Sequence, residues 1–320
     1  MMIKNLMITL ALTLFLMFPL SVPVKAEGGK PIIVCTTNAV GSLVREYMGE
    51  SVAVVVLVQP SLCPADFDMK PSDIYAVSNA KILFKQNIPG EFWLQGLLEA
   101  AGNPNLIQVT IPGEYNTPQG AKNYIRWVGG NLSQILNIDL VAKTSAMLAD
   151  MDEVSNWMAS RGQALQVSSV KVICMKWLKT FVESAGFKVV ATYNPPETLS
   201  AGDITDLVNT AQNDKVAMIV DNLQIDVEFG RGIASQVGAE HVVLTNFPGA
   251  IPGTGNLTQM FRYNAEQLFN ATSTWRSTAS LKADMEGLRG HVAIYQITTS
   301  LAVIVAVVEA VWIYIRRKRK

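Results

Sequence analysis

The chain has 320 residues, which is long enough for two lobes or two domains once targeting segments are set aside. Lysine and arginine together number 26, as do aspartate and glutamate, so no overall basic field points to nucleic acid as a partner. Hydrophobic residues make up 49% of the chain and charged residues only 16%, and part of this imbalance lies at the two ends.

Residues 1–26 have the pattern of a secretory signal peptide. Lys4 precedes an uncharged apolar stretch over residues 6–19, and the small-residue pattern of a cleavage site ends at Ala26. We expect cleavage after Ala26 and export of the chain. An uncleaved membrane anchor is the alternative.

Residues 27–118 are predicted to form a first lobe in which strands and helices alternate. The expected strands are short and apolar, and stretches with helical spacing separate them. Apolar strands without period-two alternation indicate a parallel sheet whose two faces are both covered by helices. We expect these strands at residues 31–37, 52–58, 81–86 and 106–111.

Residues 119–166 contain no strand pattern and are predicted to form a helical connector, in which Asp139 can start a second helix. The alternation returns in residues 167–290, which we expect to form a C-terminal lobe and a stalk. The fold class is therefore α/β, with two βα lobes of mainly parallel strands. Ligands bind at the carboxyl ends of such strands, so a cleft between the lobes is the expected site.

Residues 291–315 are predicted to form a transmembrane helix. The apolar stretch can cross roughly 30 Å of hydrocarbon at about 1.5 Å per residue, and the basic residues 316–320 should stay in the cytoplasm. We therefore expect a single-pass protein of the cell membrane whose lobes are extracellular. Glu309 lies inside this span, where an ionisable group suggests a function; the alternative is that it snorkels or sits protonated.

An enzyme is not expected. The chain has two histidines, of which His291 lies at the membrane boundary and His241 begins a predicted strand, at the end of the sheet away from the cleft. A serine or cysteine nucleophile therefore has no evident base. The sequence also lacks the G-x-S-x-G and G-x-x-x-x-G-K-[ST] motifs.

From residue 31 to about residue 272, the chain resembles the solute-binding proteins of zinc- and manganese-type ABC transporters. The resemblance implies two βα lobes joined by a long helix. It also implies an extracellular receptor that binds a metal ion or metal complex as cargo and works with an ABC permease and its ATPase. It is carried by the order and spacing of "VCTTNAVGSLVREYMGESVAVVVLVQP", "CPADFDMKPSDIYAVSNAKILFKQN", "IVDNLQ", "GAEHVVLTN" and "LTQMFRYNAEQL".

The family's metal ligands carry over in part. Its first histidine falls on Ala65, with Asp66 beside it, and its second should lie near Glu114. The carboxylate of its third ligand strand matches Asp221, and its last aspartate falls on Asn246. The usual histidines are thus absent, although imidazole is a principal zinc ligand.

The three cysteines are further candidate ligands. Cys35, Cys63 and Cys174 each end a predicted strand or begin the loop after it, so we expect them to point toward the cleft. Thiolates favour soft or borderline metals, and a metal site would combine Asp66, Asp221 and Cys63. The alternatives are a disulfide between Cys35 and Cys63, or inert buried thiols.

Two further functions remain open at this point. The same scaffold could bind a non-metal organic ligand, or the chain could be a surface or adhesion protein without a role in transport. We expect the loop after the second strand to form one wall of the cleft. In that loop Asp66 should touch the ligand, whereas Asp68 should bond to amides of the loop or to the start of the following helix.

Overall fold

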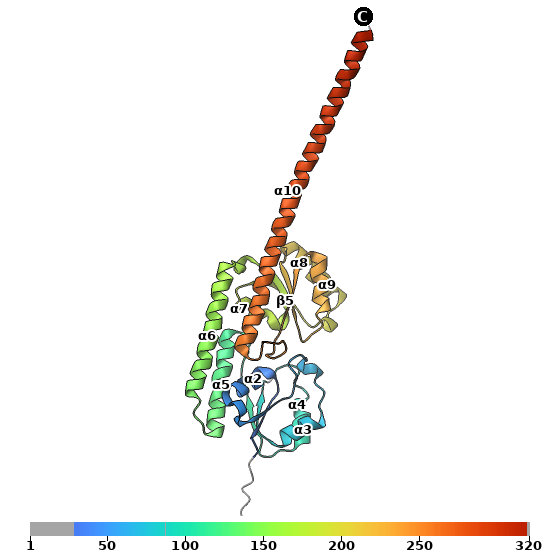
Figure 1. Ribbon diagram of the computed structural model, residues 1–320. Coiled ribbons are helices and arrows are strands. Elements are labelled where there is room, and N and C mark those ends of the chain that lie inside the picture. The colour runs from blue at the N-terminus through green and yellow to red at the C-terminus, as the bar shows by residue number, and fades with distance from the viewer. Residues whose placement is uncertain (1–28, 87, 319–320) are drawn as a thin grey trace, which may run out of the picture.

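The computed structural model describes residues 29–86 and 88–318. The expected signal peptide and the last two residues of the basic tail lie outside these ranges. Two α/β lobes are stacked end to end, two helices run along one side, and a long helix leaves the upper lobe (Figure 1). The predicted fold class, with two mainly parallel sheets, is confirmed.

The first lobe is built on a four-stranded parallel sheet with the order β2-β1-β3-β4. Val34 and Leu83 lie on one face of this sheet in a small apolar cluster, and Ile33 and Phe84 lie on the other in the main core. Burial on both faces explains why the strands read as continuous apolar runs. The elements are β1 (Ile32–Cys35), α2 (Asn38–Met48), β2 (Ala53–Val56), α3 (Pro71–Ser78), β3 (Ala80–Lys85), α4 (Leu94–Ala101) and β4 (Ile107–Thr110).

The second lobe repeats this plan with the order β6-β5-β7-β8, again all parallel. Ser200 begins α8 with a capping box, in which its hydroxyl accepts a hydrogen bond from the Asp203 amide and the Asp203 carboxylate accepts one from the Ser200 amide. The elements are β5 (Lys171–Met175), α7 (Lys179–Ser184), β6 (Lys188–Tyr193), α8 (Ala201–Asp214), β7 (Met218–Asn222), α9 (Glu228–Val237) and β8 (Glu240–Leu244).

The connector consists of two helices that pack against each other, α5 (Pro118–Leu136) and α6 (Val141–Ala164). The chain reverses between them at Asn137, which adopts the left-handed conformation (φ 54°). The Tyr47 hydroxyl of α2 donates to the Ile125 carbonyl of α5 over 2.9 Å. This bond ties the connector to the first lobe, and α6 runs on beside the second lobe (Figure 1).

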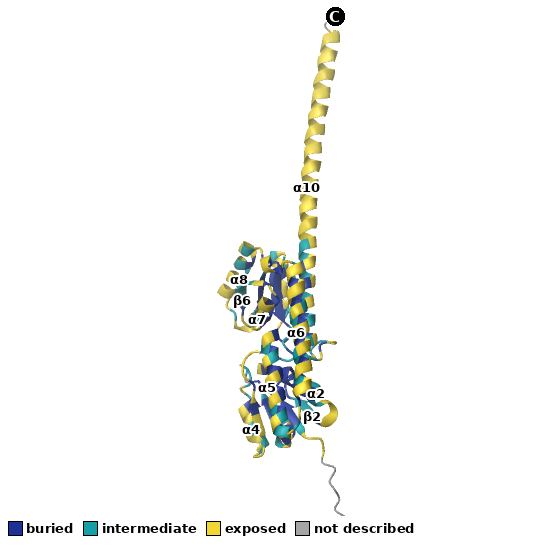
Figure 2. Ribbon diagram, turned by 90° about the vertical axis from the view of Figure 1, so that its left-hand side faces the viewer, coloured by how far each residue is buried: buried dark blue, intermediate teal, exposed yellow. Residues whose placement is uncertain are grey.

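Helix α10 (Leu257–Lys318) belongs to the second lobe at its start and leaves it further on. Its first turns bury Phe261, Leu268 and Phe269 in the core. From residue 277 to residue 318 every residue is exposed (Figure 2). This part contains a window with a mean hydropathy of 2.0, long and apolar enough to cross a membrane.

Candidate functional site

The carboxyl ends of the two sheets face each other, and the loops that follow them form the contact between the lobes. Asn38, at the start of α2, donates through Nδ2 to the Pro248 carbonyl over 2.6 Å. Gln224, after β7, donates through Nε2 to the Pro60 carbonyl over 2.7 Å. The predicted site between the lobes is therefore a hydrogen-bonded interface, which we call the inter-lobe interface.

The buried centre of the inter-lobe interface is rich in hydroxyl and amide groups. The Thr36 hydroxyl accepts from the Gln86 amide over 3.1 Å, and the Thr37 hydroxyl donates to the Gln86 side chain. On the second-lobe side of the interface, Gln224 donates to the Thr245 hydroxyl over 2.9 Å. Within the described residues, the buried Asn222 Nδ2 has no hydrogen-bond partner. The centre thus offers amide and hydroxyl groups.

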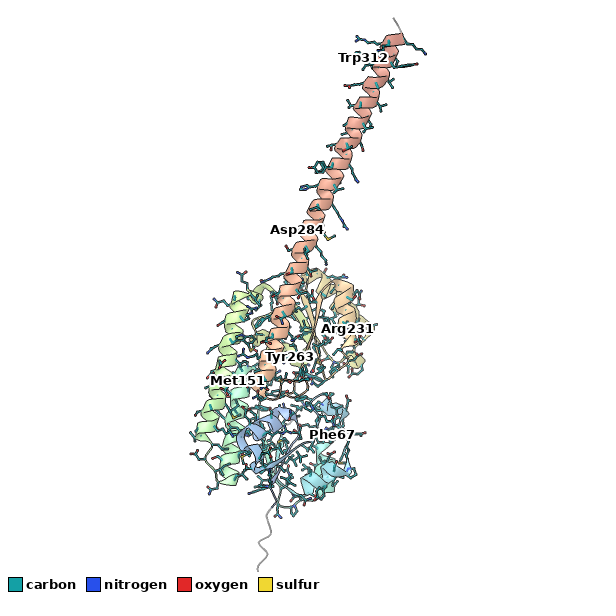
Figure 3. The ribbon with its side chains drawn as sticks, in the orientation of Figure 1. Phe67, Met151, Arg231, Tyr263, Asp284 and Trp312 are labelled. Carbon is teal, nitrogen blue, oxygen red and sulfur yellow. The ribbon has the colours of Figure 1, made fainter. Side chains whose placement is uncertain are left out.

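The loop after β2 is held rigidly against the first lobe. Cys63 precedes the short 3-10 helix η2 (Pro64–Asp66), and the Trp93 indole donates to the Pro64 carbonyl over 2.8 Å. The Phe67 ring, labelled in Figure 3, lies 4.2 Å from the Trp93 ring, centroid to centroid. A loop held in this way loses little conformational entropy when a ligand binds.

The role expected for Asp68 is filled by another residue. The Asp73 carboxylate accepts a hydrogen bond of 2.8 Å from the Lys70 amide at the start of α3. Asp68 is exposed. The carboxylate three residues inside the helix is in the position of the acidic partner of a capping box, and it satisfies the amide before the helix.

At the edge of the inter-lobe interface, the Cys63 thiol lies within the electrostatic influence of two carboxylates, Asp66 and Glu197. We call these three groups the acidic mouth. Glu197 belongs to the second lobe, in the 3-10 helix η5 (Pro196–Thr198) that follows β6. The pKa of the Cys63 thiol is raised, first by burial and then by the negative charges of Asp66 and Glu197. Asp66 and Glu197 are both exposed, and no hydrogen bond holds either carboxylate within the described residues.

Glu197 was not among the residues singled out from the sequence. The available signal was its place in "NPPET", directly after a strand of the second lobe. Like "QPSLCPAD" after β2 in the first lobe, this turn contains two prolines followed by an acidic residue. Both loops leave the carboxyl end of a strand next to the first strand of its sheet, so they extend from corresponding edges of the two lobes.

Cys35 and Cys174 lie in the hydrophobic core and not at the interface. Both are fully buried, and burial raises the pKa of each thiol to about 12. All three cysteines are free thiols, so the disulfide considered between Cys35 and Cys63 is not formed. Of the cysteines, the structure brings only Cys63 to the acidic mouth, and the other two have the character of small buried hydrophobic residues.

Asp221 does not join the acidic mouth either. Its carboxylate accepts hydrogen bonds from the Tyr193 hydroxyl and, over 2.6 Å, from Nε2 of His241. It lies directly against Gly230 of α9, on the outer face of the second sheet. His241 pairs in register with Ile219, two residues before Asp221, so both side chains point to the same face. This buried network explains how Asp221 can be buried without facing the cleft.

The remaining two candidates lie close to the interface. The Asn246 amide donates to Gln224 Oε1 over 3.1 Å, and the Asn246 carbonyl accepts from the Tyr115 hydroxyl. Glu114 is exposed beside Tyr115. In residues 29–86 and 88–318, no three His, Cys, Asp or Glu side chains lie close enough together to hold a metal ion in this arrangement.

Comparison with known proteins identifies relatives of this chain. Residues 33–271 match the profile of the ZnuA family, described as zinc-uptake complex component A, periplasmic. The chain is 22% identical over 273 residues to the manganese-binding lipoprotein MntA of Halalkalibacterium halodurans, a match that covers 78% of this chain and 91% of the relative.

Solved structures show the same fold. The periplasmic zinc-binding protein TroA from Treponema pallidum superposes with a TM-score of 0.65 at 16% identity, covering 76% of this chain and 99% of that one. A Mn-bound periplasmic metal-binding protein from Candidatus Liberibacter asiaticus superposes with a TM-score of 0.59 at 12% identity, covering 76% of this chain and 100% of that one.

Proposed function

Because the chain belongs to the ZnuA family of solute-binding proteins of ABC transporters, we propose that it captures a divalent transition-metal ion at the acidic mouth and delivers it to an ABC permease. The observation that carries this proposal is that the buried Cys63 thiol has a pKa raised by burial and by the negative charges of Asp66 and Glu197, which come from different lobes. The first lobe supplies Asp66 and Cys63, and the second supplies Glu197.

The electrostatics of the acidic mouth favour a cation. Two carboxylates that raise the pKa of a nearby thiol form a negative site, and a divalent ion would neutralise it and stabilise the thiolate. One sulfur and two carboxylate ligands suit a borderline ion such as Zn²⁺ better than a hard ion such as Mg²⁺. The printed names of the relatives include zinc-binding and Mn-bound proteins, which supports the same class of cargo.

Metal binding at this site would draw the lobes together. Among the described residues, no three such side chains lie close enough together to hold one ion, so binding requires these three groups to approach one another. Because the Asp66 and Glu197 side chains are exposed and held by no hydrogen bond in the described residues, they can turn toward an ion without breaking existing contacts. A receptor whose ligands come from both lobes can thereby present a different surface to its permease when it is loaded.

One observation favours a second candidate cargo. The centre of the inter-lobe interface is rich in amide and hydroxyl groups, and the buried Asn222 Nδ2 has no hydrogen-bond partner among the described residues; neutral donors and acceptors suit a polar organic ligand or a chelated metal. Native mass spectrometry of the purified chain distinguishes the two: a bound bare ion supports the first cargo, and a co-purified organic compound supports the second.

The exposed apolar part of α10 supports the proposal that the receptor is anchored by a single transmembrane helix with its lobes outside the cell. The same topology keeps the acidic mouth near a permease in the same membrane, because diffusion is then confined to two dimensions.

Calorimetric titration of the full chain with Zn²⁺ and Mn²⁺ tests the proposed cargo. We expect one bound ion per chain. We also expect affinity to rise between pH 6 and pH 8 by up to about tenfold per pH unit, since the thiol has a raised pKa and must release its proton to bind a metal.

The Cys63→Ser variant should bind more weakly and lose this pH dependence. If neither Zn²⁺ nor Mn²⁺ bound to the chain, the proposal would be wrong. If the affinity of Cys63→Ser rose with pH as steeply as that of the unmodified chain, Cys63 would not be a ligand.

A further inference from the structure

The free part of α10 carries a single apolar stripe on an otherwise polar surface. Between residues 277 and 291 the large apolar residues are Leu281, Met285 and Leu288, with side chains 64%, 56% and 68% exposed. Their spacings of four and three residues place them on one face of the helix. Three large apolar side chains aligned in water indicate a face that needs a partner.

The stripe continues into the apolar span with the same alternation of four-residue and three-residue spacings. Val292, Tyr295 and Thr299 follow at spacings of four, three and four, and a shallow groove on the helix lies between them. Ala302, Ala306 and Glu309 extend the series, whereas most of the span is built from Val, Ile and Leu. We call the positions 281, 285, 288, 292, 295, 299, 302, 306 and 309 the α10 seam. Alternate spacings of three and four over this length are typical of a coiled-coil face.

The charges beside the α10 seam identify its partner. Taking Met285 and Leu288 as positions a and d of a heptad, Asp284 occupies position g and Arg289 occupies the next position e. In a parallel pair of helices, position g of one copy lies beside position e of the other, five residues further along. Asp284 of each copy therefore meets Arg289 of the other, so the charges are complementary to a second copy of the same helix. Asp284, labelled in Figure 3, lies on the free part of α10 and is exposed.

We propose that two copies of this chain associate in parallel through the α10 seam, forming a coiled-coil stalk that continues into the membrane. This inference rests on the anchored topology proposed above, because two copies inserted in one membrane in the same orientation are necessarily parallel.

The membrane part of the seam fits the same pairing. Small residues at an interface allow transmembrane helices to approach closely, and Thr299, Ala302 and Ala306 supply them. An ionisable residue within a span is costly when it faces lipid, and Glu309 on the seam would instead face the partner's Glu309. When one of the two carboxyl groups is protonated, it can donate a hydrogen bond to the other.

Disulfide crosslinking of the full chain in membranes tests the proposal. The native thiols are buried, so they give little background. Leu288→Cys places a thiol on the seam, and Glu286→Cys, at position b on the opposite side, is its matched control. We expect oxidation to crosslink Leu288→Cys into dimers and to leave Glu286→Cys monomeric. Equal crosslinking at the two positions, or none at either, would overturn the proposal.

A charge exchange in the Leu288→Cys background identifies the partner. Asp284→Arg alone, or Arg289→Asp alone, should lower the dimer fraction by roughly two- to fivefold, because exposed ion pairs are weak and each change replaces attraction with repulsion. The two changes together should restore dimer formation. If the double exchange did not restore dimers, the pairing of the two helices would be contradicted. Crosslinking to a co-expressed permease instead would show that the permease occupies the seam.

The same samples distinguish failure of the anchor from failure of the dimer. Loss of the chain from the membrane fraction would count against the proposed anchor, whereas membrane-bound monomers count only against the dimer.

Discussion

Combined replacement of Asp66 with Asn and Glu197 with Gln should lower metal affinity by at least about 30-fold. Losing a charged partner costs roughly 1–3 kcal/mol per group, and each 1.4 kcal/mol is a factor of ten. Both substitutions keep the size of the side chain and remove only the charge. Because one residue comes from each lobe, each single variant should lose part of the affinity, and the combined variant should lose the most.

Two controls accompany this prediction. Asp68→Asn removes an exposed carboxylate from the same loop and should change affinity less than threefold, which is within the effect of a distant surface charge. The melting temperature of the metal-free combined variant should match that of the unmodified chain, because neither carboxylate is hydrogen-bonded in the described residues. Unchanged affinity in the combined variant, measured by the same titration, would show that cargo binds elsewhere.

Replacing Gly230 with Ala should destabilise the second lobe by roughly 1–3 kcal/mol, the cost of leaving a buried polar group unsatisfied. A Cβ at this position would lie 2.5 Å from both Cγ and Oδ1 of Asp221. Either α9 must move off the sheet, or the Asp221 carboxylate must give up its bonds to Tyr193 and His241. Thermal unfolding followed by circular dichroism should show a melting temperature lower by several degrees.

Gly232→Ala, two residues further along the same helix, is the matched control. Nothing lies within 4 Å of a Cβ built there, and alanine favours a helix over glycine by up to about 1 kcal/mol. This variant should therefore be as stable as the unmodified chain or slightly more stable. If both variants melted at the same temperature, close packing of α9 on Asp221 would not be a determinant of stability.

The fold could be predicted from the sequence because its signals are local and consistent. Each strand is a short apolar run followed by a helix with its own start and stop residues, as in β5 followed by α7. The long apolar helix at the end of α10 could also be predicted, because an apolar span followed by basic residues is typical of a transmembrane helix.

The site could be predicted only in part, because side-chain direction and the meeting of distant loops are not local properties. Asp221 ends a strand, as expected of a cleft residue, but its position in the alternation directs it to the outer face, where His241 and Tyr193 bind it. Cys35 and Cys174 also lie at strand ends, yet they point into the core. The charge of Glu197 acts on the Cys63 thiol only because η5 of the second lobe and the loop after β2 of the first lobe lie on the same side of the interface.

X-ray absorption spectroscopy of the zinc-loaded full chain tests the proposed metal site most directly. If Cys63, Asp66 and Glu197 hold the ion, the spectrum should contain one sulfur at about 2.3 Å together with oxygen ligands at about 2.0–2.2 Å. The sulfur contribution should disappear in Cys63→Ser. A zinc ion with no sulfur ligand in the unmodified chain, or with a sulfur ligand that persists in Cys63→Ser, would contradict binding at the acidic mouth.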